Sequence, residues 1–154
     1  MKRILYAVIL AIALLIPERG TDIGELRPVG LIQVYKEGTK IWIVTDTGDS
    51  GWGENVDAAL QNLKDTTPGT IYLDTADYLL VSKTAIEESK TLGQYLNAST
   101  KVCLAERYVE PAEAAEYLKV HEIYTKVGDI WDYSGVKVLE KVNSRLILKD
   151  GKEI

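Results

Sequence analysis

Residues 29–44 read VGLIQVYKEGTKIWIV and residues 48–63 read GDSGWGENVDAALQNL, and these two stretches decide the fold. The first contains two runs rich in β-branched and aromatic residues, separated by Lys36-Glu37-Gly38-Thr39. Gly38 can take the positive φ of a tight turn, so we predict a β-hairpin. In the second, apolar residues recur at the i, i+3, i+4, i+7 spacing of one helix face. This spacing predicts a helix over residues 54–65, preceded by a glycine-rich loop.

Strands and helices alternate along the rest of the chain. Short apolar runs predict further strands at residues 70–73 and 78–82 (one bent strand or two successive ones), 100–105, 136–142 and 145–149, the last two turning at Asn143-Ser144. Helices are predicted at residues 84–96 and from Pro111, which suits a first helical turn. On the latter helix we expect Ala112, Ala115 and Leu118 to pack inward. The order β-β-α-β-α-β-α-β-β predicts an α+β (α/β-like) fold, a mixed sheet with helices packed on it.

Composition excludes several classes of function. The 154 residues, 46% hydrophobic and 27% charged, are typical of one globular domain, which we place at residues 28–154. Eighteen basic and 23 acidic residues give a net charge of −5, which disfavours a nucleic-acid partner. Cys103 is the one cysteine and His121 the one histidine, so an internal disulfide and a Cys/His zinc site are excluded. We expect no cofactor.

The N-terminus predicts export. Lys2 and Arg3 precede an apolar run at residues 4–16, and Pro17 follows the run. Thirteen helical residues would span roughly 20 Å, less than a hydrocarbon core of about 30 Å, which favours a signal peptide over a full transmembrane helix. We therefore assign residues 1–17 to a signal peptide or N-terminal membrane anchor and residues 18–27 to a spacer. The expected location is the outer face of the cell membrane, with membrane contact through residues 4–16, or secretion.

Asp46-Thr47-Gly48 follows a predicted strand, as the catalytic aspartate of aspartic proteases does. A chain of this length could supply half of a homodimer in which two such aspartates share a proton, so Asp46 is the candidate catalytic residue of this alternative. Two features argue against a protease. Thr45 stands where that family usually has an apolar residue, and the loop runs into a helix where the family continues with a strand. Turn chemistry explains the same three residues.

The acidic residues around the glycine-rich stretch suggest a second alternative. Asp46, Asp49, Glu54 and Asp57 could hold Ca²⁺, although their spacing departs from the EF-hand order. The glycine-rich stretch before a helix also suggests a phosphate-binding site, but the same acids would repel a phosphate group. Acids near the start of a helix interact favourably with the helix dipole, so capping of the following helix is the better explanation. A serine nucleophile in Gly48-Asp49-Ser50-Gly51 is disfavoured, because the histidine follows it in the chain.

Trp52, flanked by Gly51 and Gly53, is the residue that we expect to touch a partner. Trp42 and Trp131 are interpreted as core or rim residues. Cys103 alternates between Val102 and Leu104, as a packed thiol would. We expect His121 to be a surface or helix-capping residue.

Residues 22–120 are similar, in the order and spacing of their elements, to the N-terminal domain of the C subunits of bacterial spore germinant receptors, the Ger(x)C family. The shared features begin with acidic residues, Asp22 and Glu25, before a strand hairpin, followed by the helix pattern of residues 57–63. The elements that follow are a strand at residues 72–81, a helix at 84–96, a strand at 102–105 and a helix from Pro111. Members of that family are lipoproteins with further domains, whereas here no cysteine stands directly after the apolar run. The resemblance would make this chain a stand-alone, truncated version of the first domain.

The resemblance implies an exported, membrane-associated and non-enzymatic protein of a spore-forming bacterium. Such a protein acts by contact with integral-membrane partners, for example receptor subunits, as an accessory factor in sporulation or germination. No catalytic residues are transferred by the resemblance. We therefore expect an extracytoplasmic protein-interaction domain, with a homodimeric aspartic protease and a small Ca²⁺- or ligand-binding module as the alternatives.

Overall fold

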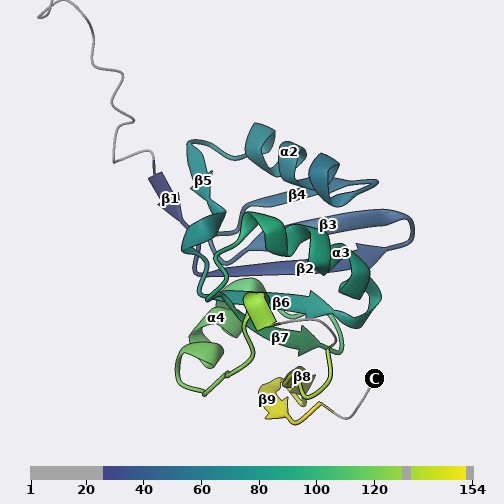
Figure 1. Cartoon of the computed structure of the whole chain (residues 1–154), viewed down its shortest axis with the longest axis vertical. Coiled ribbons are helices and arrows are strands. Elements are labelled where there is room, and N and C mark those ends of the chain that lie inside the picture. The colour runs from purple at the N-terminus through teal and green to yellow at the C-terminus, as the bar shows by residue number, and fades with distance from the viewer. Residues whose placement is uncertain (1–25, 130–132, 152–154) are drawn as a thin grey trace, which may run out of the picture.

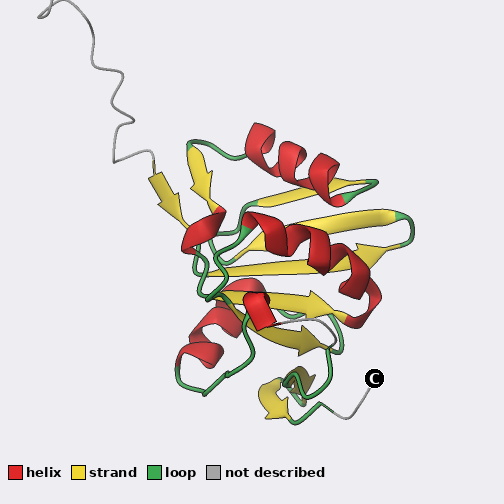
Figure 2. Ribbon diagram, viewed as in Figure 1, coloured by secondary structure: helices red, strands yellow, loops and turns green. Residues whose placement is uncertain are grey.

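The computed structural model describes residues 26–129 and 133–151. Within these residues, three helices pack on a seven-stranded mixed sheet, and a second sheet of two parallel strands lies beside it (Figures 1 and 2). The large sheet has the order β4 (Ser50–Gly53), β3 (Lys40–Thr45), β2 (Leu31–Glu37), β6 (Tyr78–Ser82), β7 (Lys101–Ala105), β8 (Val138–Val142) and β9 (Arg145–Lys149). The small sheet pairs β1 (Leu26–Pro28) with β5 (Thr70–Tyr72), and the helices are α2 (Val56–Thr66), α3 (Ile86–Leu92) and α4 (Pro111–Lys119).

The centre of the large sheet is parallel and its two sides are antiparallel. Strands β2, β6, β7 and β8 run in the same direction, and the arrowheads of β2, β6 and β7 point the same way in Figure 1. On one side, β3 pairs antiparallel with β2 and β4 pairs antiparallel with β3, and on the other side β9 pairs antiparallel with β8. The mixed sheet with packed helices that the sequence predicts is therefore confirmed.

Each face of the sheet has its own apolar core. Helices α2 and α3 bury their apolar faces on one side, over residues that include Ile32, Leu79 and Val102. Helix α4 packs on the opposite side, over residues that include Leu80 and Cys103. Because side chains alternate along a strand, neighbouring residues of β7 enter different cores. The alternation predicted for Cys103 is confirmed.

Most elements lie where the sequence predicts them. The β2–β3 hairpin turns at Gly38 with φ +61°, and the β8–β9 hairpin turns at Asn143 and Ser144 with φ 48° and 63°. The two apolar runs at residues 70–82 are two strands of different sheets, separated by a 3-10 turn at Leu73–Thr75. The helix predicted at residues 84–96 is shorter, because 3-10 turns flank α3 on both sides.

Two details of the prediction are wrong or incomplete. On α4, Ala112 is exposed and Ala114 takes the buried position beside Ala115 and Leu118. The reason is that Pro111 is itself buried, and it sets the phase of the inward face at i, i+3, i+4 and i+7. Strand β1 was not predicted, and its residues 26 and 27 fall in the stretch that the sequence assigns to a spacer.

Residues 1–25, including the apolar run, and Trp131 lie outside the described residues.

The prediction of a glycine-rich loop at residues 48–53 is wrong for its second half, because Ser50–Gly53 form strand β4. Gly51 and Gly53 face α2, and a Cβ on Gly51 would lie 2.3 Å from the Leu63 backbone nitrogen. A Cβ on Gly53 would lie 2.5 Å from the Ala59 nitrogen. The helix backbone therefore lies directly on the strand backbone, an approach that only glycine permits.

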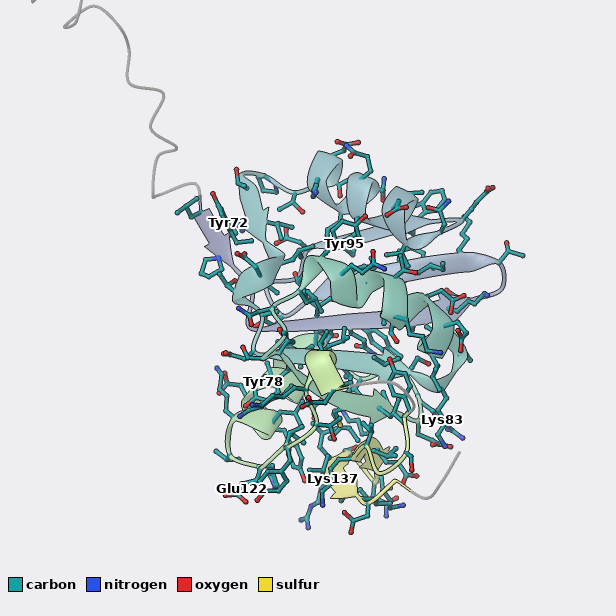
Figure 3. The ribbon with its side chains drawn as sticks, in the orientation of Figure 1. Tyr72, Tyr78, Lys83, Tyr95, Glu122 and Lys137 are labelled. Carbon is teal, nitrogen blue, oxygen red and sulfur yellow. The ribbon has the colours of Figure 1, made fainter. Side chains whose placement is uncertain are left out.

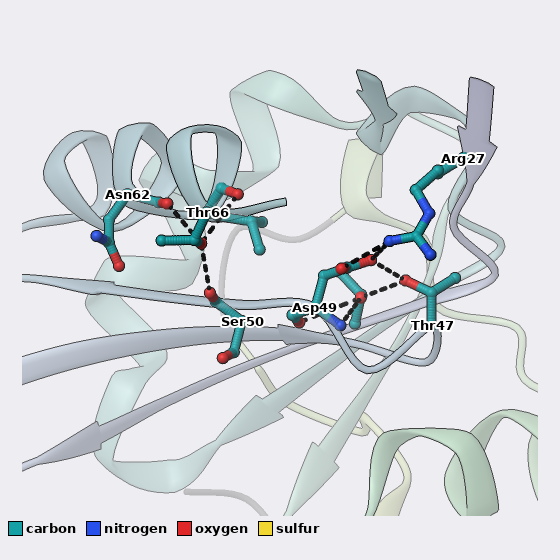
Figure 4. Close-up of polar contacts among 8 residues, drawn as sticks. Arg27, Thr47, Asp49, Ser50, Asn62 and Thr66 are labelled. Carbon is teal, nitrogen blue, oxygen red and sulfur yellow. Dashed lines mark hydrogen bonds and ion pairs between the residues drawn. The ribbon is translucent and has the colours of Figure 1, made fainter. Parts of the chain in front are cut away.

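Side chains of α2 also complete the outer edge of β4. Asn62 Oδ1 accepts a hydrogen bond from the Trp52 amide at 3.0 Å, and the Thr66 hydroxyl donates to the Ser50 carbonyl at 3.2 Å. Figure 4 shows Asn62, Thr66 and Ser50 at this contact. These contacts occupy backbone groups that an edge strand otherwise offers to another chain.

We predict that Gly51→Ala lowers the free energy of unfolding by about 3 kcal/mol or more, because the new methyl group has no space between β4 and α2. Denaturant unfolding followed by circular dichroism measures the change. Gly93→Ala is the matched control, since its Cβ would meet only the Val127 side chain at 3.1 Å. Equal stability of Gly51→Ala and the wild type would contradict the packing described for α2.

Candidate functional site

A row of aromatic side chains crosses the large sheet on the face opposite α2. Gly51 and Gly53 face α2, so the alternation of β4 directs Trp52 to the other face. Trp42 lies opposite Trp52 in the β3–β4 pairing, and Tyr35 lies opposite Trp42 in the β2–β3 pairing. We call these three residues, together with Tyr108 after β7, the aromatic face.

The rings of the aromatic face contact one another in sequence. The ring centroids of Tyr35 and Trp42 are 6.1 Å apart with planes 3° from parallel, and those of Trp42 and Trp52 are 6.3 Å apart. Tyr108 meets Tyr35 edge-on, with centroids 5.3 Å apart and an interplanar angle of 71°. Such contacts hold the rings in fixed positions and stabilise the row beyond simple burial. Two segments distant in sequence, β2–β4 and the residue after β7, thus build one surface.

The two ends of the row are open to solvent. Trp52 is 43% exposed and Tyr108 is 50% exposed, whereas Tyr35 and Trp42 are half-buried. Helix α4 packs on β2 and β3 on this face but leaves both ends uncovered. Burial raises the pKa of the Tyr35 hydroxyl, and the neighbouring Glu37 raises it further, so the ring stays neutral at physiological pH.

Lys40 gives the aromatic face a positive rim. Its Nζ lies 3.9 Å from the centroid of the Trp52 ring, within the range of a cation–π contact. Among the described residues, Lys40 has no carboxylate partner. The surface therefore combines exposed rings with one cation whose charge is still available to a binding partner.

Two side chains on this face of the sheet, Gln33 and Trp42, carry buried polar groups without partners among the described residues. Gln33 is fully buried on β2, and neither Nε2 nor Oε1 of its amide has a hydrogen-bond partner among the described residues. The indole nitrogen of Trp42, on the neighbouring strand, is buried and unpaired in the same way. A buried amide without partners lowers stability.

Asp46 and Asp49 stabilise the turn between β3 and β4. One oxygen of Asp46 accepts a hydrogen bond from the Gly30 amide at 3.1 Å. Asp49 forms an ion pair with Arg27 at 2.9 Å and accepts a hydrogen bond from the Thr47 hydroxyl at 2.7 Å (Figure 4). After this turn the chain enters β4, which pairs antiparallel with β3, and α2 follows β4. These contacts give Asp46 a structural role and supply no feature that favours the protease alternative.

The four candidate calcium ligands do not come together. Asp46 and Asp49 precede β4, whereas Glu54 and Asp57 follow it, so the whole strand separates the two pairs. Asp57 instead accepts a hydrogen bond from the Tyr95 hydroxyl at 2.6 Å. Within residues 26–129 and 133–151, no three His, Cys, Asp or Glu side chains are grouped as a metal site would require. The proposed ligand set therefore lacks structural support.

The candidate contact residues Gly51, Trp52 and Gly53 lie in a strand and not in a loop. Of the three, only Trp52 is exposed, because the glycines pack on α2. Sequence reasoning missed Tyr35, Tyr108 and Lys40 as members of the same surface. The hairpin register around Gly38 already pairs Tyr35 with Trp42, whereas no local signal brings in Tyr108.

His121 and Cys103 occupy structural positions. The His121 Nδ1 lies 2.7 Å from the Tyr117 carbonyl at the end of α4, and the two rings stack with centroids 3.9 Å apart. Cys103 is buried and donates a hydrogen bond to the Lys137 carbonyl at 3.2 Å. Burial raises the pKa of the Cys103 thiol to about 12, so the thiol stays protonated at neutral pH.

No protein-family model, no curated protein and no solved structure matches the chain. None of the described helices is long and apolar enough to cross a membrane.

We predict that Gln33→Met raises the free energy of unfolding by about 1–2 kcal/mol, because it replaces an unpaired buried amide by an apolar side chain of similar volume. Denaturant unfolding measures the change. As a control, Gln33→Glu should destabilise the fold, since it buries a carboxylate. A loss of stability in Gln33→Met would show that the amide is hydrogen-bonded in solution.

We also predict that Cys103 of the native protein resists alkylation by iodoacetamide at pH 8. The thiolate is the reactive form, and a pKa raised from 9.0 to about 12 leaves very little thiolate at that pH. The same reagent should modify Cys103 rapidly in guanidinium chloride. The mass of the protein records both reactions, and rapid labelling of the folded protein would contradict the burial described for Cys103.

Proposed function

We propose that this chain is a non-enzymatic, extracytoplasmic domain that binds a protein partner through the aromatic face. The observation that supports the proposal best is the fixed row of rings across β2, β3 and β4, with Trp52 and Tyr108 exposed at its ends. Tryptophan and tyrosine are enriched at the centres of protein interfaces, where they bury large area at a small cost in side-chain entropy.

The charge of the face favours a particular kind of partner. Lys40 holds its ammonium group above Trp52 and has no carboxylate partner within the described part of the chain. A partner with an apolar centre and an acidic residue at its edge would cover the rings and pair with Lys40. The row extends over three neighbouring strands, which suits contact with a folded protein surface.

The location and the class of the partner belong to the same proposal. The apolar run at residues 4–16 supports export and attachment to the membrane. The resemblance of residues 22–120 to the first domain of germinant receptor C subunits supports an integral-membrane partner and an accessory role in sporulation or germination. Residues 1–25, which carry the membrane contact in this proposal, lie outside the described structure.

Fractionation tests the location. A tagged full-length chain should appear in the membrane fraction of cells that are forming spores, and its intact mass should show whether residues 1–17 are retained. A cleaved product that is secreted during vegetative growth would contradict the germination role and leave the binding role of the aromatic face to be tested alone.

For the binding role, we predict that Trp52→Ala leaves the chain folded and weakens capture of its membrane partner by about thirtyfold. This factor corresponds to the loss of a central interface contact of about 2 kcal/mol. The measurement is co-purification of the full-length chain with its partner from native membranes, followed by titration of the purified pair. Circular dichroism verifies that the variant is folded.

The matched control is Tyr124→Ala, which removes an aromatic ring that is 72% exposed and lies outside the aromatic face. The control should bind as the wild type does. Equal binding by Trp52→Ala and the wild type would exclude the aromatic face as the docking surface.

A further inference from the structure

A second surface lies at the carboxyl edge of the parallel strands. The chain leaves β6 towards α3, which packs on one face of the sheet, and leaves β7 towards α4, which packs on the other. Where adjacent parallel strands send their connections to opposite faces, a crevice opens between their carboxyl ends. In Figure 3, Lys83 lies at this edge, next to the ends of β6 and β7.

The crevice has a volume of about 450 Å³ and is lined by the ends of three parallel strands. This volume falls within the range of small-molecule sites. Its lining consists of Tyr35, Lys36, Glu37, Ser82, Thr84, Glu106, Arg107 and Tyr108. Hydrogen bonds fix its centre, because the Ser82 and Thr84 hydroxyls are 3.1 Å apart and the Lys36 amide donates to Thr84.

Most charges around the crevice are already neutralised by a neighbour. Lys36 pairs with Glu88 at 2.9 Å, and Glu106 pairs with Lys83 at 2.5 Å. Glu37 and Arg107 are different, since neither side chain forms an ion pair or hydrogen bond with another described residue. The crevice therefore offers one free carboxylate and one free guanidinium.

The two free charges stand on opposite sides of the crevice. Glu37 ends β2 and Arg107 follows β7, and β6 lies between these strands. Two strand spacings place the β2 and β7 backbones roughly 10 Å apart. Two residues of extended chain span at most about 7 Å, a length comparable with the separation of these two strands.

We infer that this crevice binds a small zwitterion of dipeptide size, whose ammonium group pairs with Glu37 and whose carboxylate pairs with Arg107. The planar guanidinium of Arg107 suits bidentate recognition of a carboxylate. Tyr108, half exposed and held edge-on against Tyr35, provides an apolar wall for a side chain of the ligand. This site shares the Tyr35–Tyr108 pair with the aromatic face but does not include Trp52.

Chemical-shift titration of the full-length ¹⁵N-labelled chain in detergent tests the inference with Gly-Phe as the probe. Gly-Phe should produce saturable shifts at the amides of residues 36–37, 82–84 and 106–108. N-acetyl-Gly-Phe lacks the ammonium and Gly-Phe amide lacks the carboxylate, so each should bind about tenfold more weakly, the effect of losing one charge-assisted hydrogen bond. Free phenylalanine should also bind more weakly, because its charges are too close together.

Single substitutions test which side chain pairs with which charged end of the dipeptide. Arg107→Gln should bind Gly-Phe and its amide equally, and Glu37→Gln should bind Gly-Phe and its N-acetyl derivative equally. Arg145→Gln and Glu54→Gln remove charges elsewhere and should behave as the wild type. A Trp52→Ala chain should retain the titration, so that failure of the docking proposal and failure of this one are distinguishable.

Absence of saturable shifts at the crevice would overturn the inference. Equal binding of Gly-Phe and its two single-charge derivatives, or shifts confined to residues 40–52, would also overturn it, since either result removes the role of the two charges.

Discussion

The direct contact between α2 and β4 is the constraint on which the rest of the structure depends. With no side chain on Gly51 or Gly53, the backbone of the helix lies against the backbone of the strand. This approach brings Asn62 and Thr66 to the outer edge of β4, where they hydrogen-bond to its backbone. The same two glycines fix the alternation of the strand, so the residue between them has to face away from the helix.

The aromatic face follows from that alternation. Trp52 is directed to the side of the sheet that α4 covers only in part, and the antiparallel register continues the row through Trp42 to Tyr35. The parallel centre adds Tyr108, because β7 ends at the same edge as β2. A packing requirement on one face thus produces an exposed aromatic surface on the other. The acids of the β3–β4 turn, Asp46 and Asp49, hold this arrangement and take no part in the surface.

Local signals in the sequence account for the hairpins, the helices and the mixed sheet. Gly38 and the pair Asn143-Ser144 mark turns that the structure places as predicted. The prediction was wrong where tertiary contacts override local preference: glycine is depleted in strands, so the sequence around Trp52 resembles a loop until α2 is placed on it. On α4, Ala115 and Leu118 face inward as predicted, and only Ala112 was wrong, because Pro111 and Ala114 take the remaining inward positions. The flanking glycines of Trp52 predict it as a candidate contact residue, whereas Tyr108 lies beside Tyr35 through a long-range contact that no local pattern contains.

Site-specific photo-cross-linking in living cells tests the central claim most directly, namely that the α2–β4 contact turns the aromatic row into a docking surface. A photoreactive benzoyl-phenylalanine is introduced at position 52, at position 108 or, as a reference, at position 124. The account predicts one adduct of the same mass from positions 52 and 108, formed with a membrane protein, and none from position 124. Adducts from position 124 together with none from position 52 would contradict it.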